Sequence, residues 1–167
     1  MLWPDRAEIV SLLRRCDDAG HLERPAGFDY ATESRRFGQL VAGLEESFGC
    51  ACAVDTGARV QDASYFGQVV VPGPATMAGV PIFIRVSNFG GLALVGAEGP
   101  GRYDDAETLS LLADADLTQV LETLANHDYV PLLEDVLGDE YDGISDVLRG
   151  AYPSYPPTWF IRFFDYL

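Results

Sequence analysis

The sequence predicts an α+β fold, in which an antiparallel sheet of about four to five strands is packed by N-terminal and C-terminal helices. Two observations predict it. Apolar residues recur at helical spacing near the start of the chain and again after residue 104, whereas residues 50–96 form short β-rich runs separated by Gly and Pro. Segregated helices and strands favour such a sheet over a wound parallel one. The length fits one domain, and we expect residues 1–167 to form it.

Two helices are predicted before the sheet. The first covers residues 3–20, with Pro4 at its first position and Gly20 as its stop signal. The second covers residues 34–49, with Ser34 as the expected N-cap. Apolar residues repeat along both segments at helical spacing, so we expect each helix to pack one face against the core.

Four strands are predicted from runs of β-forming residues. In the third run, apolar residues at even positions alternate with Phe83, Arg85 and Ser87, a pattern typical of an antiparallel strand with one buried face. The segment SNFGGL that follows predicts a hairpin turn, because Asn and Gly tolerate positive φ. The four runs are residues 50–54, 64–71, 80–87 and 92–96.

The chain returns to helices after the fourth strand. One helix is predicted to start near Asp104, where acidic residues oppose the helix dipole favourably. Another is predicted over residues 116–127, with Asp116 opening a capping box. Residues 128–133 are predicted to be an edge strand, because Pro131 cannot donate a hydrogen bond to a neighbouring strand.

The last predicted element is a short helix in the segment PTWFIRFFDYL, with Thr158 as its cap. Its aromatic and aliphatic side chains cover well over half of the helix circumference, and an exposed patch of that size is more than a monomer tolerates. We therefore expect this helix to close the core against the sheet, with Arg162 and Asp165 on its solvent side.

Charge narrows the class of partner. The formal net charge is −15, and residues 98–167 hold 15 acidic residues against 3 arginines, a net charge of −12. The phosphates of nucleic acid and of anionic membranes would be repelled by such a surface, so we expect no nucleic-acid partner and no membrane partner. A basic protein remains compatible with this charge.

Neither a leader nor a metal site is expected from the sequence. The first residues lack a basic stretch followed by an apolar run, and no segment has the apolar length of a membrane helix, so we expect a cytoplasmic protein. Cys50 and Cys52 should point to opposite faces of a strand. His21 and His127 match no known ligand spacing. We expect no metal and no cofactor.

The candidate site is a protein-binding surface in the acidic half of the chain. Tyrosines are interleaved with carboxylates there, and residues 138–143 carry the densest acidic run. Aromatic anchors combined with oriented charge are typical of tight protein interfaces. The expected charged contacts are Asp135, Asp139, Glu140 and Asp142, and the expected aromatic anchors are Tyr103 and Tyr141.

The chain resembles the small acidic immunity proteins that bacteria encode beside secreted or polymorphic toxins. The resemblance rests on the α+β layout at this length, the run QDASYFGQVVVP…IFIRVSNFGGLALV, and the acidic, Tyr-rich half that ends in PTWFIRFFDYL. It implies a non-catalytic protein that binds a cognate toxin domain in the cytoplasm and blocks its active site. The toxin is expected to carry a basic surface around that site.

Two alternatives stay open at the level of sequence. One is a small cytosolic enzyme that uses His127 with nearby carboxylates, since Asn126 and Asp128 flank this histidine. The other is an interaction or regulatory module without a toxin partner. A buried pocket that contains His127 and a carboxylate would favour the enzyme, whereas an adjacent toxin gene would favour the immunity protein.

Overall fold

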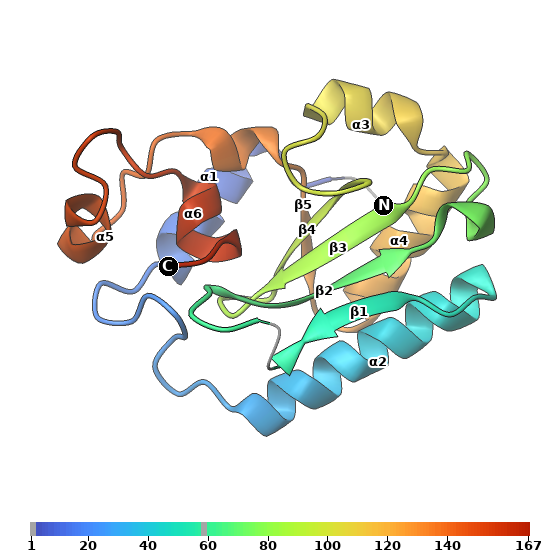
Figure 1. The fold of residues 1–167 in the computed structure, drawn as a ribbon, viewed down its shortest axis with the longest axis horizontal. Coiled ribbons are helices and arrows are strands. Elements are labelled where there is room, and N and C mark those ends of the chain that lie inside the picture. The colour runs from blue at the N-terminus through green and yellow to red at the C-terminus, as the bar shows by residue number, and fades with distance from the viewer. Residues whose placement is uncertain (1–2, 58–59) are drawn as a thin grey trace.

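The structure is a computed structural model that describes residues 3–57 and 60–167. Helices and strands follow the expected order, with helices first, a strand meander next and helices last (Figure 1). The elements are α1 (Arg6–Cys16), α2 (Tyr30–Phe48), β1 (Ala53–Thr56), β2 (Tyr65–Val71), η2 (Gly73–Ala75), β3 (Ile82–Ser87), β4 (Leu92–Ala97), α3 (Asp105–Leu111), α4 (Asp114–Asn126), β5 (Val130–Leu132), η3 (Asp135–Gly138), α5 (Asp146–Gly150) and α6 (Trp159–Phe164).

The strands form one sheet in the order β1-β2-β3-β4-β5, and the α+β prediction is confirmed. Adjacent strands from β1 to β4 pair antiparallel, and the Gly90–Gly91 turn between β3 and β4 has positive φ at both residues, as expected. The predicted edge strand is β5, but it pairs parallel to β4. The sheet is therefore mixed, because α3 and α4 carry the chain back across the sheet before β5 begins.

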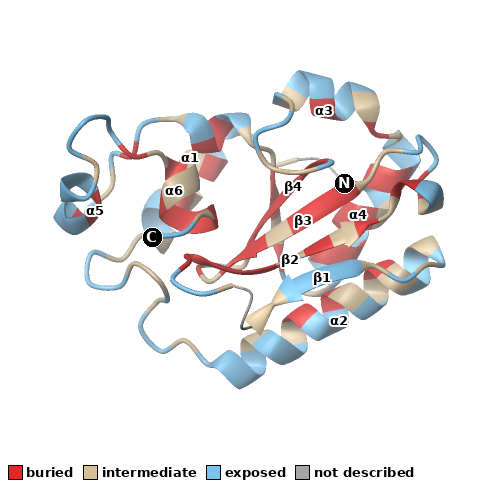
Figure 2. Ribbon diagram, in the orientation of Figure 1, coloured by how far each residue is buried: buried red, intermediate tan, exposed pale blue. Residues whose placement is uncertain are grey.

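Both faces of the central strand are buried, so the prediction of one buried face for residues 80–87 is wrong (Figure 2). Ile82 and Ile84 belong to the core between the sheet and helices α2 and α4. Phe83 belongs to a second core, formed with α1, η3 and α6. The alternating pattern suggested an exposed face because that face contains Arg85. This arginine is half-buried instead, and it donates hydrogen bonds to Gln68 Oε1 at 2.9 Å and to Phe164 O at 2.8 Å.

Three helices start elsewhere than predicted. Helix α1 begins at Arg6, after its N-cap Asp5, rather than at Pro4, and it ends at Cys16, four residues before Gly20. Helix α2 begins four residues before Ser34, since the Asp29 carboxylate accepts a hydrogen bond from Thr32 N at 3.1 Å and caps it. Helix α4 begins after Ala113. The buried Asp116 carboxylate accepts a hydrogen bond from Met77 N at 2.7 Å, so it anchors the loop between β2 and β3 rather than opening a capping box.

Helix α6 closes the second core, as predicted. Trp159, Phe163 and Phe164 are buried, and the Thr158 hydroxyl accepts a hydrogen bond from Ile161 N at 3.3 Å. The prediction that Arg162 faces solvent is wrong. Its side chain is 0% exposed and lies against the Asp17 carboxylate, which is 1% exposed, with Nε 2.7 Å from Oδ1. This buried ion pair joins the end of α1 to α6.

The guanidinium of Arg162 is surrounded by acceptors. It also donates to the carbonyl oxygens of Leu22 at 3.1 Å, Asp18 at 3.1 Å and His21 at 3.0 Å. The ring of Phe89 lies on it at 4.4 Å from the ring centroid. A buried charge is tolerated only when it is paired and hydrogen-bonded, and this arrangement meets that condition.

Replacing Arg162 with Met should destabilise the protein strongly. The substitution leaves the Asp17 carboxylate buried without its cation, which costs about 3–5 kcal/mol of the free energy of unfolding. Urea unfolding of the Arg162→Met variant measures this loss. As a control, Arg6→Ala breaks an ion pair with Asp139 whose side chains are 60% and 43% exposed, and it should leave the unfolding midpoint nearly unchanged. Equal effects of the two substitutions would contradict the central role of Arg162.

Candidate functional site

Two of the predicted site residues, Tyr103 and Asp135, lie together on an acidic hollow between α3 and η3. The hollow has a volume of about 380 Å³ and is open to solvent. Four of its lining side chains are carboxylates, so a cationic group is the chemistry it can accept. The lining residues are Gly101, Arg102, Tyr103, Asp104, Glu107, Glu134, Asp135, Gly138 and Phe160.

Backbone N–H groups hold the carboxylates of this region in place. Asp105 N donates to Asp135 Oδ1 at 3.2 Å, and Asp135 N donates to Asp105 Oδ1 at 2.9 Å, so the two residues cap each other across 30 positions of sequence. Asp104 caps α3 through a capping box with Glu107. Because these bonds fix the carboxylates before any ligand arrives, binding a cation costs little ordering entropy.

Burial and mutual repulsion act on the acids beside the hollow. Burial is the largest cause that raises the pKa of Asp105, and the charge of Asp135 adds to it. Burial likewise raises the pKa of Glu134, whose Oε1 accepts a hydrogen bond from Gly101 N at 2.8 Å. A bound cation would relieve the cost of keeping these acids ionised.

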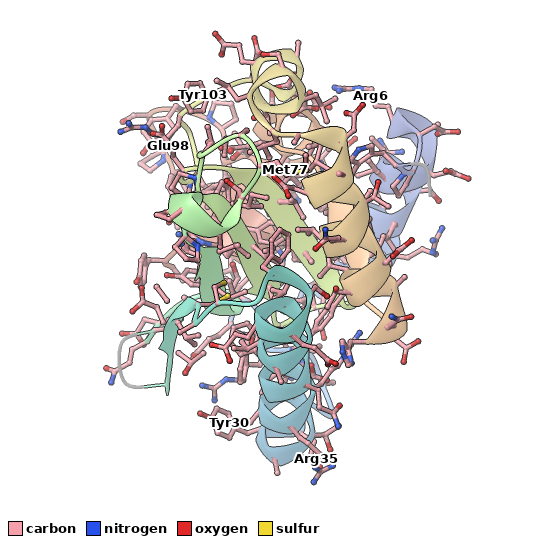
Figure 3. The ribbon with its side chains drawn as sticks, turned by 90° about the vertical axis from the view of Figure 1, so that its right-hand side faces the viewer. Arg6, Tyr30, Arg35, Met77, Glu98 and Tyr103 are labelled. Atoms are coloured by element: carbon pink, nitrogen blue, oxygen red, sulfur yellow. The ribbon has the colours of Figure 1, made fainter. Side chains whose placement is uncertain are left out.

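The arginine that lines the hollow does not neutralise it. Arg102 Nη2 lies 2.8 Å from Oε2 of Glu98, a residue outside the lining, and the Tyr103 hydroxyl donates to the other oxygen of Glu98 at 3.1 Å. Figure 3 shows Tyr103 and Glu98 close together on the opposite side of the view from Arg6. The lining carboxylates therefore keep their negative field.

The predicted residues of the 139–142 turn lie elsewhere. Asp139 forms an ion pair with Arg6 at 2.5 Å, and Asp142 forms one with Arg14 at 2.5 Å, so both carboxylates fasten the turn to α1. Glu140 is exposed, and its backbone forms an isolated bridge with Thr158. The acidity that the sequence shows in this turn is partly neutralised by a helix more than a hundred residues away.

Tyr141, expected as an exposed anchor, lies in the second core with 2% of its surface exposed. Its hydroxyl donates a hydrogen bond to Asp17 Oδ2 at 2.5 Å and accepts one from Ser145 N at 2.9 Å. Its pKa is raised to about 12, mainly by burial and next by the Asp17 carboxylate. Tyr141 thus supports the neighbouring backbone, and in this conformation it does not form part of the surface.

Sequence reasoning missed three carboxylates of the hollow: Asp104, Glu107 and Glu134. A signal for the first two was present, because Asp104 and Glu107 stand in capping-box spacing and so had to lie together at the start of α3. No local pattern indicates that Glu134 joins them. Its position follows from the Asp105–Asp135 contact next to it.

Histidine and cysteine chemistry has no assembled site in the part of the chain that the structure describes. A search of those residues finds no group of three or more His, Cys, Asp or Glu side chains that could hold a metal ion. The expectation that Cys50 and Cys52 point apart is wrong, because residues two positions apart share one face of an extended chain. Burial raises the pKa of Cys52, and its interaction with the neighbouring Cys50 thiol raises it further. His127 is half-buried at the end of α4, and its role as a base stays a hypothesis.

Comparisons with family models, with curated proteins and with solved structures found no match for this chain. Its function is therefore inferred from its own residues. Among the described residues, no helix has the length and apolar character needed to cross a membrane. The acidic hollow is the group of side chains whose chemistry most directly indicates a class of ligand.

The raised pKa values predict a pH dependence of stability. An acid whose folded pKa exceeds its unfolded value binds its proton at a higher pH in the folded state, so the contribution of Asp105 and Glu134 to stability rises as the pH falls from about 7 toward about 4, near the ordinary pKa of a carboxyl group. The Asp105→Asn/Glu134→Gln variant should show a smaller rise, because the amides keep acceptor oxygens but do not titrate. Urea unfolding at the two pH values measures this. The Glu46→Gln/Glu122→Gln variant, with two exposed acids removed, should behave like the wild type; if it instead matched the first variant, general charge repulsion would explain the effect.

Proposed function

We propose that this chain is a non-catalytic immunity protein that binds a basic toxin domain and blocks it in the cytoplasm. The acidic hollow carries the proposal, since its fixed carboxylates and the adjacent Tyr103 ring suit a lysine or arginine side chain of a partner. The resemblance to acidic immunity proteins supports the same reading.

The charge distribution supports a mechanism by which this protein would inhibit a toxin. Toxin domains that act on nucleic acid need a basic surface to hold phosphates. The half of the chain that bears the hollow has a net charge of −12, so it can occupy such a surface in place of phosphate. Oriented negative charge also speeds the encounter with a basic partner, by roughly 10- to 1000-fold. Inhibition of this kind is stoichiometric and needs no reaction.

The aromatic part of the proposed surface is Tyr103. Its ring is half-buried and its hydroxyl is fixed by Glu98, so it offers a rigid, amphipathic contact beside the carboxylates. Among the other predicted contacts, Asp135 lines the hollow and Glu140 is exposed. Asp139 and Asp142 would contribute only after exchanging their arginine partners on α1 for cations of the toxin.

Removing charge from the hollow should weaken partner binding. In the Asp104→Asn/Glu107→Gln/Asp135→Asn variant each amide oxygen can still accept its hydrogen bond from a backbone N–H, so the fold is kept while three charges are lost. The dissociation constant for the proposed toxin partner should rise at least about tenfold, equal to about 1.4 kcal/mol. Isothermal titration calorimetry at rising salt measures affinity and its salt dependence, which should be shallower in the variant.

The matched control is Glu46→Gln/Asp114→Asn/Glu122→Gln, which removes three exposed carboxylates from α2 and α4. Its affinity should equal that of the wild type. Co-expression with the toxin gives a second readout, since the hollow variant should fail to rescue growth while the control succeeds. An unchanged affinity in the hollow variant, or a wild-type affinity that does not fall with salt, would contradict inhibition by charge.

A further inference from the structure

The segment from Gly143 to Tyr155, here called the α5 arm, projects from the body of the molecule at the end away from β1 and α2 (Figure 1). Three of its apolar side chains are largely exposed: Ile144 at 64%, Val147 at 67% and Tyr155 at 61%. Figure 2 shows that most of the arm is exposed whereas the neighbouring α6 is largely buried. Scattered apolar residues on a surface are ordinary, but three on one short projection need a reason.

Residues 143–148 of the arm are held in place by hydrogen bonds, so Ile144 and Val147 do not reach solvent through a loose loop. Ile144 N donates to the buried Asp17 carboxylate at 2.9 Å, and Ser145 N donates to the Tyr141 hydroxyl at 2.9 Å. Ser145 Oγ accepts a hydrogen bond from Leu148 N at 3.1 Å and caps α5. Leu148 is buried in the second core.

Gly143 shows how closely the arm is fitted. A Cβ at this position would collide with the Asp17 carboxylate and with the Tyr141 ring, so only glycine fits. The carbonyl of Gly143 also accepts a hydrogen bond from Arg149. The backbone on both sides of Ile144 is thus fixed by contacts that point inward, while Ile144 and Val147 point outward. A surface fixed before binding loses little conformational entropy when a partner covers it.

The charges around the arm indicate what can cover it. Asp142 and Asp146 lie beside the apolar side chains, with side chains 53% and 95% exposed, and each is bonded to a single arginine, Arg14 and Arg149 respectively. A second copy of the chain would bring two molecules of net charge −15 together and place these carboxylates against their own counterparts. A basic protein avoids this repulsion, and its cations can pair with the two rim carboxylates in exchange for Arg14 and Arg149.

We propose that the α5 arm is an apolar anchor that enters a recess on a basic partner protein, with Ile144, Val147 and Tyr155 as its contacts and Asp142 and Asp146 as its polar rim. Apolar anchors enclosed by polar groups are the usual source of binding energy in interfaces. The inference rests on the proposed function in taking that partner to be the toxin that also binds the acidic hollow.

The first test places a photo-crosslinking amino acid, p-benzoylphenylalanine, at Val147 of the full chain in its native cells. The expected result is one adduct with a basic protein, identified by mass spectrometry. An adduct between two copies of this chain, an adduct with an acidic protein, or no adduct would overturn the proposal. The same residue placed at Val54, an exposed apolar position on β1, is the control and should give no such adduct.

The second test uses the purified partner protein that the crosslinking experiment identifies. The Ile144→Ser/Val147→Ser variant should bind this partner with a dissociation constant at least about tenfold higher than that of the wild type, mainly through faster dissociation. The thermal midpoint of the variant should equal that of the wild type. Val54→Ser, at the exposed apolar position on β1, should leave affinity unchanged. An unchanged affinity in the double variant would overturn the anchor. If the double variant weakens binding but the acidic-hollow variant does not, the proposed function fails while the anchor stands.

Discussion

The buried Asp17–Arg162 pair is the interaction on which the second face of the sheet depends. It joins three segments that are distant in sequence: the residues after α1, the 141–145 backbone and α6. Each charge is compensated within the core, Arg162 by carbonyl oxygens and aromatic rings, and Asp17 by Tyr141 and Ile144 N. Since an unpaired charge cannot stay buried, these segments must assemble together.

This dependence explains where the acidic surface lies. The second core brings α1 beside the 139–142 turn, where Arg6 and Arg14 compensate Asp139 and Asp142. The acidic hollow between α3 and η3, lined by Tyr103, keeps four carboxylates. The same core holds the α5 arm in place through contacts with Asp17, Tyr141 and Leu148. One arrangement of buried polar groups thus positions a charged surface and an apolar one.

Periodicity was sufficient to predict the order and type of the main elements, because burial of apolar residues on one face leaves a local pattern in sequence. It failed for polar residues with remote partners. Arg162 seemed to mark a solvent face, and Asp116 a helix cap, because their partners Asp17 and Met77 N are not visible locally. For the same reason, only part of the site was predicted. The contact between Asp105 and Asp135 brings Asp135 beside Tyr103, and this contact is not visible in the local sequence.

The face of the sheet that carries Phe83, Leu94 and Leu132 is covered by residues from both ends of the chain. During synthesis α1 leaves the ribosome well before α6, and this face of the sheet is fully covered only after α6 has followed. Until then this apolar face is exposed, as is usual for contacts between residues far apart in sequence. A nascent chain stalled before residue 159 would therefore be a substrate for chaperones and proteases until α6 is made.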